Sequence, residues 1–272
     1  MEKRIGIIGN GFVGEALAFA FSSKFETRVY DINKSKSLNT LEQVYECEII
    51  FVCVPTPMFS DGTQDLSYIN NVFKNAVHGP LYIIKSTILP GTTLSLIKKH
   101  NLKIIFSPEF LTERTAKLDM LTQSRIILGG DKKNTKFARE IFEHRFKNRN
   151  IIETDSNTAE LVKYMNNIFF ATKVSIMNEF KLIADKIGAN WEDALYGFSS
   201  DGRVGDSHLN VPGHDGKLGY GGTCFPKDVC SLINFVKKYN IKINTIEGGW
   251  KTNLEVRSEK DWESKIGRSV SK

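Results

Sequence analysis

A glycine-rich turn near the start of the chain has the spacing that binds dinucleotides. It follows a strand-like run at Arg4 to Ile8, precedes an amphipathic stretch at Glu15 to Phe21, and reads Gly9-Asn10-Gly11-Phe12-Val13-Gly14. Such glycines let the backbone turn tightly and let a pyrophosphate approach the N-terminus of the helix. Asp31 ends the next strand-like run, where a carboxylate takes the ribose hydroxyls. The pattern predicts binding of NAD(P) or FAD, and the alternative is a tight turn that serves structure only.

The residues around Asp31 bear on the choice between NAD and NADP. A carboxylate at this position would repel the 2′-phosphate of NADP, which favours NAD. Arg28, Lys34 and Lys36 are close in the sequence and could offset that repulsion. NAD is therefore the expected cofactor, with NADP left open by the nearby cations.

A cysteine in a second glycine-rich segment could act as a nucleophile. Cys224 lies between glycines and a predicted helix in the segment Gly219-Tyr220-Gly221-Gly222-Thr223-Cys224-Phe225-Pro226-Lys227-Asp228. The helix N-terminus and Lys227 would both favour the thiolate, which is the form that attacks carbonyl carbons. The glycines would let a ligand approach the backbone, and the alternative is a buried structural cysteine. The chain's other cysteines, which we interpret in that way, are Cys47, Cys53 and Cys230.

Three polar residues of a long helical stretch fall on one face. Glu160, Lys163 and Asn167 are spaced by three and four residues. A lysine and an asparagine on one face could hold an oxyanion, whereas the alternative is a solvent-exposed polar stripe. Glu109 follows Pro108 at the predicted carboxyl end of a strand, which suits a general base.

The elements that must position these residues follow an α/β pattern in the first half. Short β-branched runs alternate with amphipathic stretches, which indicates βαβ units and a parallel sheet. The predicted strands are Arg4 to Ile8, Arg28 to Tyr30, Glu48 to Val54, Leu81 to Lys85, Lys103 to Phe106 and Arg125 to Leu128. Three of them end in proline-bearing turns, at Val54 to Pro57, Ser86 to Pro90 and Ser107 to Glu109. These turns would lie at the carboxyl edge of the sheet, where open α/β sheets bind ligands.

The second half is predicted to be helical. One helix should run from Ser156 to Lys186, a second should begin near Trp191, and another should span Asp228 to Tyr239. Eight of the chain's 21 glycines fall between Gly197 and Gly222, which predicts a long loop. The end from Glu255 is charged and is expected to be loosely held.

The expected organisation is therefore a Rossmann-type NAD-binding domain followed by an all-α central domain. The limits are residues 1–154 for the first, 155–252 for the second with the cysteine loop, and 253–272 for a charged tail. A helix over residues 156–186 would span about 46 Å, more than so small a domain could bury alone. We therefore expect a homodimer through this helix.

Composition excludes several other classes of protein. The hydrophobic fraction is 41% and the net charge +6, as in ordinary globular proteins, and no apolar run is long enough to cross a membrane. A cytoplasmic protein without a membrane partner is expected. The densest basic block, Lys132 to Arg149, has apolar residues at helical spacing and is interpreted as a solvated amphipathic helix, with a nucleic-acid surface as the alternative. The cysteine and histidine spacings, including His208 and His214, predict no metal site.

In six ordered motifs the chain resembles the nucleotide-sugar dehydrogenases, and most closely the UDP-glucose 6-dehydrogenases. The motifs are Gly9 to Gly14, Phe51 to Pro57, Lys85 to Thr87, Ser107 to Leu111, Glu160 to Asn167 and Gly219 to Asp228. Members of this family oxidise a primary alcohol of a nucleotide-linked sugar to a carboxylate. They use two NAD⁺ and a covalent thiohemiacetal and thioester on a cysteine.

The resemblance implies a role for individual residues. Cys224 would be the nucleophile and Glu109 would serve thioester hydrolysis, while Lys163 and Asn167 would stabilise the oxyanion. Asp228 and Thr87 would position water and the catalytic groups. The residues it places at NAD are Gly9, Gly11, Phe12, Val13, Gly14, Asp31, Lys36, Val54, Pro55, Thr56, Ser86, Thr87, Glu113 and Lys227. Those it places at the sugar nucleotide are Glu109, Phe110, Leu111, Lys163, Asn167, Arg203, Tyr220 and Gly221, with Arg203 acting across a dimer contact.

The matching motifs cover the family's cofactor domain and central helical domain. Family members usually continue into a third domain that holds the nucleotide end of the substrate, and no motif of that domain is matched. UDP-glucose is favoured as the substrate over UDP-N-acetylmannosamine or GDP-mannose. The competing interpretation is a non-catalytic, or domain-complemented, NAD-binding dimer module.

Overall fold

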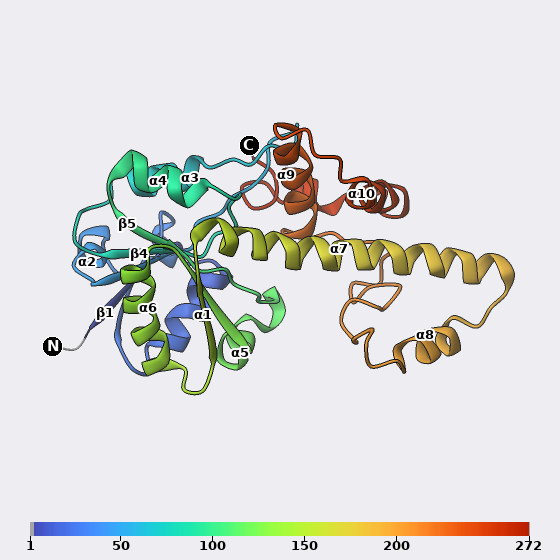
Figure 1. Ribbon diagram of the computed structural model, residues 1–272, viewed down its shortest axis with the longest axis horizontal. Coiled ribbons are helices and arrows are strands. Elements are labelled where there is room, and N and C mark those ends of the chain that lie inside the picture. Colours follow the sequence, from blue (N-terminus) through green and yellow to red (C-terminus); the bar gives the residue numbers. More distant parts are fainter. Residues whose placement is uncertain (1–2, 272) are drawn as a thin grey trace. The chain divides into compact units, whose positions relative to one another are not determined.

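The chain folds into two compact units. A computed structural model describes residues 3–271, and Figure 1 shows its ribbon. Unit 1 comprises Met1–Thr56 and Asp65–Lys163, and unit 2 comprises Pro57–Gln64 and Tyr164–Lys272. The passage from unit 1 to unit 2 thus falls inside the long helix, and a short segment from the first half of the chain belongs to unit 2.

All the named strands lie in unit 1. They are β1 (Arg4–Ile8), β2 (Glu26–Tyr30), β3 (Ile49–Val52), β4 (Leu81–Ile84), β5 (Lys103–Phe106), β6 (Arg125–Gly129) and β7 (Asn150–Thr154). They form one sheet in the order β2-β1-β3-β4-β5-β6-β7. The six predicted strands are confirmed, and β7 is an addition.

The sheet is parallel except at one pair of strands. The strands β1 to β5 are parallel to their neighbours and so are β6 and β7, but β5 meets β6 antiparallel through Phe106 and Gly129. The connection between β5 and β6 holds only the 3-10 turn η2 (Glu113–Thr115) and the short helix α5 (Ala116–Thr122). Seven helical residues span about 10 Å, which is short for the crossover that a parallel neighbour needs.

Helices cover both faces of this sheet (Figure 1). One face packs against α1 (Phe12–Phe21), α5 and α6 (Lys132–Arg145), and the other against α2 (Leu41–Tyr45), α3 (Ser67–Lys74) and α4 (Thr92–His100). Successive strand residues alternate between the two cores, so that Ile83 faces the first and Tyr82 and Ile84 face the second. A short 3-10 turn, η1 (Lys34–Lys36), follows β2.

The strand order makes neighbouring loops diverge at the carboxyl edge of the sheet. The chain passes from β1 through α1 to β2 on one side, and β3 lies on the other side of β1. The loops that leave β1 and β3 therefore diverge, which is the topological switch point where open α/β sheets bind ligands. This confirms the expected edge for the glycine turn and for the turn after Val54.

Unit 2 is mainly helical. It contains most of α7 (Ser156–Ile187), then α8 (Trp191–Ser199), α9 (Phe225–Lys237), α10 (Asn244–Val256) and the 3-10 turn η3 (Asp261–Ser264). The predictions of a long helix from Ser156 and of a helix at Trp191 are confirmed. Helix α9 begins before the predicted Asp228 because Pro226 fits the first turn, where no N–H is needed. No helix among residues 3–271 combines the length and the apolar character that crossing a membrane requires.

Two features of unit 2 differ from the sequence-based expectation. Helix α10 was not predicted, because Gly248 and Gly249 interrupt its pattern; Gly249 lies against α7, where Ser175 Oγ donates a hydrogen bond to its carbonyl at 2.7 Å. The expectation of a loosely held end from Glu255 is wrong for the residues that follow α10. Arg257 and Trp262 are buried, since the charges there are paired and the indole is packed.

Candidate active site

In the glycine turn of unit 1, Gly9 and Gly14 are closely packed, whereas Gly11 faces open space. Gly9 has a φ of +96°, and a side chain there would touch the backbone of Cys53 on β3's loop. A Cβ on Gly14 would lie 1.9 Å from the carbonyl oxygen of Gly9, so α1 can start against the turn only with glycine at this position. A Cβ on Gly11, in contrast, would meet no atom within 4 Å. The open space at Gly11, at the N-terminus of α1, fits a pyrophosphate.

Asp31 reaches the glycine turn from the end of β2. Its Oδ2 accepts a hydrogen bond from the Asn10 N–H at 2.7 Å, and its Oδ1 accepts one from the Asn33 N–H at 2.8 Å. Each oxygen keeps capacity for a further donor, as ribose hydroxyls would supply. Within the described part of the chain, the buried Oδ1 of Asn10 has no hydrogen-bond partner. An open cradle, a carboxylate and an unused buried acceptor together fit the adenosine half of a dinucleotide.

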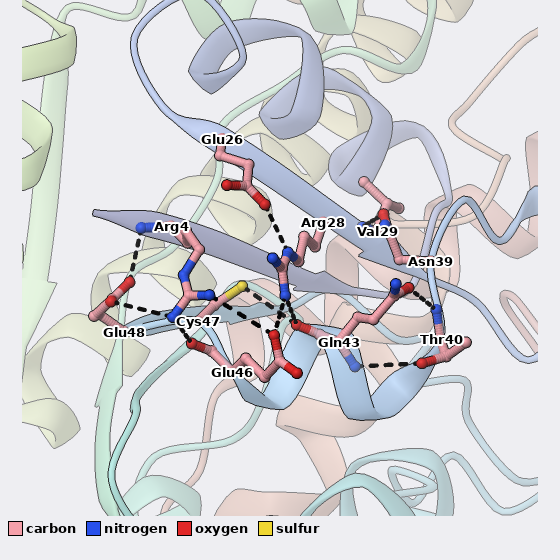
Figure 2. Close-up of polar contacts among 10 residues, drawn as sticks. All are labelled: Arg4, Glu26, Arg28, Val29, Asn39, Thr40, Gln43, Glu46, Cys47 and Glu48. Atoms are coloured by element: carbon pink, nitrogen blue, oxygen red, sulfur yellow. Dashed lines mark hydrogen bonds and ion pairs between the residues drawn. The ribbon is translucent and has the colours of Figure 1, made fainter. Parts of the chain in front are cut away.

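The charges near Asp31 do not all face the glycine turn. Figure 2 shows that Arg28 points to the α2 side of the sheet, where it lies between Glu26 and Glu46 at 2.8 and 2.5 Å. Arg4 also lies within ion-pair distance of Glu46, at 3.7 Å. Arg28 is thus held by carboxylates and is not presented to a 2′-phosphate, whereas Lys34 and Lys36 are exposed on η1. Because Arg28 is paired with Glu26 and Glu46, the structure favours NAD over NADP more strongly than the sequence does.

The loops after β3 and β4 are tied together at the same edge. Ser86 Oγ donates to the carbonyl of Val54 at 2.6 Å, and Thr56 Oγ1 donates to the carbonyl of Thr87 at 2.7 Å. The side chains of Thr56, Ser86 and Thr87 are all buried. The predicted cofactor residues Val54 to Thr56, Ser86 and Thr87 are therefore gathered in one cluster. Pro55, between the bonded residues Val54 and Thr56 in the sequence, is exposed.

A buried ion pair connects the β5 loop with helix α7. Lys163 Nζ lies 2.9 Å from Glu109 Oε1 and also donates to the Glu109 carbonyl at 2.6 Å. Burial alone would raise the pKa of Glu109, but Lys163, the Leu111 N–H and Lys85 hold that pKa below its usual value. Glu109 is thus a carboxylate at neutral pH and can accept a proton.

Lys85 is a third buried charge in this group, and no role was predicted for it. Its Nζ donates to Ser107 Oγ at 3.2 Å and to the Pro108 carbonyl at 3.0 Å. Burial lowers the pKa of Lys85 to about 8, against the opposing effects of Cys53 and Glu109. The sequence feature that could have pointed to Lys85 is its position directly after the apolar strand β4.

The alternative of an exposed polar stripe on α7 is wrong. Glu160, Lys163 and Asn167 are all at most 5% exposed. Glu160 accepts hydrogen bonds from the N–H groups of Gly91 and Thr93 and so holds the start of α4. Of the three residues on this face, Glu160 is structural, while Lys163 pairs with Glu109 in unit 1 and Asn167 bonds to Asp228 in unit 2.

A second polar group lies in unit 2. Asn167 Nδ2 donates to Asp228 Oδ2 at 2.6 Å, and Lys227 Nζ donates to Asp228 Oδ1 at 2.6 Å. Cys224 directly precedes Phe225, the first residue of α9, so its thiol lies at a helix N-terminus as predicted. Lys227 forms an ion pair with Asp228, and a helix N-terminus is a position that favours the thiolate form of a cysteine.

The other three cysteines lie in different surroundings. Burial raises the pKa of Cys47 to about 11 and that of both Cys53 and Cys230 to about 12. These thiols are therefore neutral at physiological pH, and their environments agree with the structural role expected for them.

The remaining predicted residues are either exposed on the surface or buried against other side chains. Glu113 is exposed on η2, and Arg203 is exposed and paired with Asp201. Phe110 lies beside Lys163, with Nζ 5.5 Å from the ring centre, and the Leu111 N–H donates to Glu109. Tyr220 is buried against Phe225 and Trp250, and Gly221 lies under Asp261.

Two family models match the chain. The model for the NAD binding domain of the UDP-glucose/GDP-mannose dehydrogenase family matches residues 36–146, and that for the central domain matches residues 157–255. The first match confirms NAD as the cofactor. Together the two matches cover most of the chain and span both units.

Individual relatives agree with the family models. UDP-glucose 6-dehydrogenase of Rickettsia felis is 33% identical over 83% of this chain and 52% of its own length. UDP-glucose 6-dehydrogenase YwqF of Bacillus subtilis is 35% identical over 69% of this chain and 44% of its own length. The solved UDP-glucose dehydrogenase of Pyrobaculum islandicum superposes with a TM-score of 0.85 at 25% identity, covering 94% of this chain and 68% of that one.

The chain spans about half the length of the curated relatives named above. The matched residues include the buried Glu109–Lys163 pair and the Cys224 loop. This chain belongs to the UDP-glucose/GDP-mannose dehydrogenase family.

Proposed function

We propose that the chain takes part in the NAD-dependent four-electron oxidation of a nucleotide-sugar primary alcohol to the uronate, with UDP-glucose as the favoured substrate. The observation that carries the proposal is the position of Cys224. It lies at the N-terminus of α9, whereas the three other thiols are kept neutral by burial.

Residues of unit 1 would hold the cofactor. The glycine turn and the N-terminus of α1 would take the pyrophosphate, Asp31 the adenosine ribose, and the cluster around Thr56 and Thr87 the nicotinamide half. When bound, NAD⁺ supplies the hydride acceptor for both oxidation steps. Both hydride transfers need water to be kept away from the reacting sugar carbon. The burial of the polar groups supports such exclusion of water.

Cys224 would provide covalent catalysis after the first oxidation. Its sulfur would add to the aldehyde carbon to form a thiohemiacetal, and loss of a hydride from that carbon would leave a thioester. Lys163 and Asn167 are buried donors that would stabilise the oxyanion at the tetrahedral stages. Asp228 would orient Asn167, to which it is bonded at 2.6 Å.

Glu109 would act in the last step. Its carboxylate would take a proton from water as the water oxygen attacks the thioester carbon, releasing the acid and the Cys224 thiol. The neighbouring Lys163 and Lys85 keep Glu109 ionised, so that it is ready to accept this proton.

A homodimer is part of the proposal. Helix α7 carries a row of exposed apolar side chains at helical spacing, which suits a partner helix. They are Leu161, Met165, Phe169, Ile176, Phe180, Ile183 and Ile187. Arg203 is exposed and paired with Asp201, and it would exchange this partner for the substrate of the second chain.

Turnover with a panel of nucleotide sugars tests this function. The chain is incubated with NAD⁺ and UDP-glucose, UDP-N-acetylmannosamine or GDP-mannose, and both NADH release and product mass are followed. We expect two NADH for each acid formed. Glu109→Gln should accumulate an acyl-enzyme visible as added mass on the intact chain, and Cys224→Ser should release no acid, while Cys53→Ser and Cys230→Ser remain active.

The second candidate is a non-catalytic or domain-complemented NAD-binding module. The chain spans about half the length of the curated relatives named above. NAD binding without turnover of any sugar nucleotide would favour this module. Acid formation by Cys224→Ala at the wild-type rate would refute the covalent mechanism.

A further inference from the structure

The glycine loop before Cys224 is held by side chains from the end of the chain. Asn253 of α10 is fully buried, and its Oδ1 accepts from the Tyr220 N–H at 2.7 Å while its Nδ2 donates to the Tyr220 carbonyl at 3.0 Å. The amide thus binds both polar groups of one loop residue, as a neighbouring strand would. Asn178 of α7 accepts from the Gly219 N–H at 3.0 Å.

Two charged residues continue this arrangement toward the cysteine. Arg257 is 3% exposed, and its Nε donates to Asp261 Oδ1 at 2.8 Å while its Nη1 donates to the Leu218 carbonyl at 3.3 Å. The other carboxylate oxygen of Asp261 accepts from the Gly222 N–H at 3.0 Å. Asp215, within the same long loop, binds Arg257 Nη2 at 2.6 Å. Backbone groups are therefore held from Leu218 to Gly222.

The glycines of this loop make room for these side chains. A Cβ on Gly219, whose φ is +66°, would lie 2.5 Å from Asn253 Oδ1. A Cβ on Gly221 would lie 2.0 Å from Asp261 Oδ1, closer than any side chain allows. Only Gly222 opens to free space. At Gly219 and Gly221 it is the protein itself, and not a ligand, that approaches the backbone.

We propose that Asn253, Arg257 and Asp261 are positioning residues that set the conformation of the loop Gly219–Cys224 and, through it, the reactivity of the Cys224 thiol. Only Thr223 separates the last held group, at Gly222, from Cys224. On its other side, Cys224 is fixed by the start of α9, since its carbonyl accepts from the Asp228 N–H at 3.0 Å. The thiol is thus placed at the helix terminus from both directions. The inference deepens the proposed function, because it assumes that Cys224 is the nucleophile.

Alkylation of Cys224 by iodoacetamide over a range of pH tests this inference. The rate is measured by the mass of the peptide that contains Cys224, because thiolates react and thiols do not. In Asn253→Asp the new carboxylate cannot donate to the Tyr220 carbonyl, and in Asp261→Asn the amide still offers an acceptor but loses its charge toward Arg257. Lys251→Met is the matched control, since Lys251 lies on α10 but is exposed and paired with Glu255 at 4.0 Å.

The expected result is a graded shift. The pH midpoint of alkylation should rise by about one unit in Asn253→Asp, a change of about tenfold in rate at pH 7. The rise should be smaller in Asp261→Asn and absent in Lys251→Met. Far-UV circular dichroism establishes which variants are folded, and the milder Asp261→Asn keeps the test decisive where Asn253→Asp does not fold.

Alkylation needs neither substrate nor turnover, so this inference can fail independently of the proposed function. A midpoint that coincides with the wild type's, or falls, in folded Asp261→Asn would overturn the positioning role. A raised midpoint would support that role even if no nucleotide sugar were oxidised, a result that would count against the proposed function alone.

Discussion

Replacing Lys163 by methionine should destabilise unit 1 strongly and in a manner that depends on pH. The substitution keeps most of the side-chain volume but removes the charge that faces Glu109 at 2.9 Å. Both side chains are at most 7% exposed, so the carboxylate would remain buried without its main partner. Breaking a buried pair by removing one partner costs about 3–5 kcal/mol. Because Glu109 keeps the Leu111 N–H and the nearby Lys85, we expect the lower end, about 3 kcal/mol at pH 7.

The sign of the pH dependence follows from the pKa of Glu109. In the wild type this pKa is lowered from 4.5, so Glu109 stabilises the fold above pH 4.5, and that contribution is lost as pH falls through the folded-state pKa. Without Lys163, burial dominates and raises the pKa of Glu109, so the carboxyl can take up a proton in mildly acidic solution. The difference between variant and wild type should therefore shrink between pH 7 and pH 4.5.

Urea unfolding measures this difference. All three tryptophans lie in unit 2, so fluorescence follows that unit and far-UV circular dichroism is needed for unit 1. Lys117→Met is the matched control, because Lys117 forms an exposed pair with Glu15 and should change the unfolding free energy by less than about 1 kcal/mol. Adding Glu109→Gln to Lys163→Met should recover part of the loss. A loss below about 1 kcal/mol at pH 7, or one that stays constant down to pH 4.5, would refute the assignment of a buried ion pair.

Three further predictions concern the cofactor, a buried lysine and the oligomeric state. Asp31→Ala should weaken NAD binding about tenfold or more, because charge-assisted bonds to the ribose are lost; calorimetric titration that finds equal affinity would contradict this. Lys85 has a folded-state pKa of about 8 against 10.5 when unfolded, so the unfolded state binds more protons between these values and stability rises with pH. Relative to Lys85→Met, the wild type should gain about 2–3 kcal/mol from pH 7 to pH 10 in urea unfolding, and an unchanged difference would count against a buried, ionised Lys85. Light scattering should give twice the 30.7 kDa chain mass, and Phe169→Glu should give monomers at micromolar concentration; a monomeric wild type would remove the dimer.

Much of unit 1 could be predicted from the sequence because local rules decide it. The strands are short apolar runs buried on both faces, and the prolines and glycines that follow them mark the carboxyl edge. Gly9, Gly14 and Asp31 have the spacing that a strand, a turn and a helix impose within one βαβ unit. Local spacing was therefore enough to predict the strand, turn and helix around the glycine turn.

Unit 2 was harder to predict because distant residues hold it together. The charged sequence after Glu255 suggested a solvated tail, yet Arg257 is buried since Asp215 and Asp261 satisfy its guanidinium. The glycines of the cysteine loop suggested an approaching ligand, although at Gly221 the approaching group is Asp261. Composition cannot distinguish a charge that faces water from one whose partner lies dozens of residues away.

The segment Pro57–Gln64 means that neither unit is one continuous stretch of chain. It belongs to unit 2, where the Met58 N–H donates to the Ser269 carbonyl at 2.9 Å and the Ser271 N–H donates to the Met58 carbonyl at 2.8 Å. These partners are about 200 positions apart, a separation that makes loop closure costly and late. During synthesis, unit 2 cannot close until residues 269–271 have left the ribosome. A cut in the chain after Lys163 would leave the second fragment without Pro57–Gln64, a segment of its own unit.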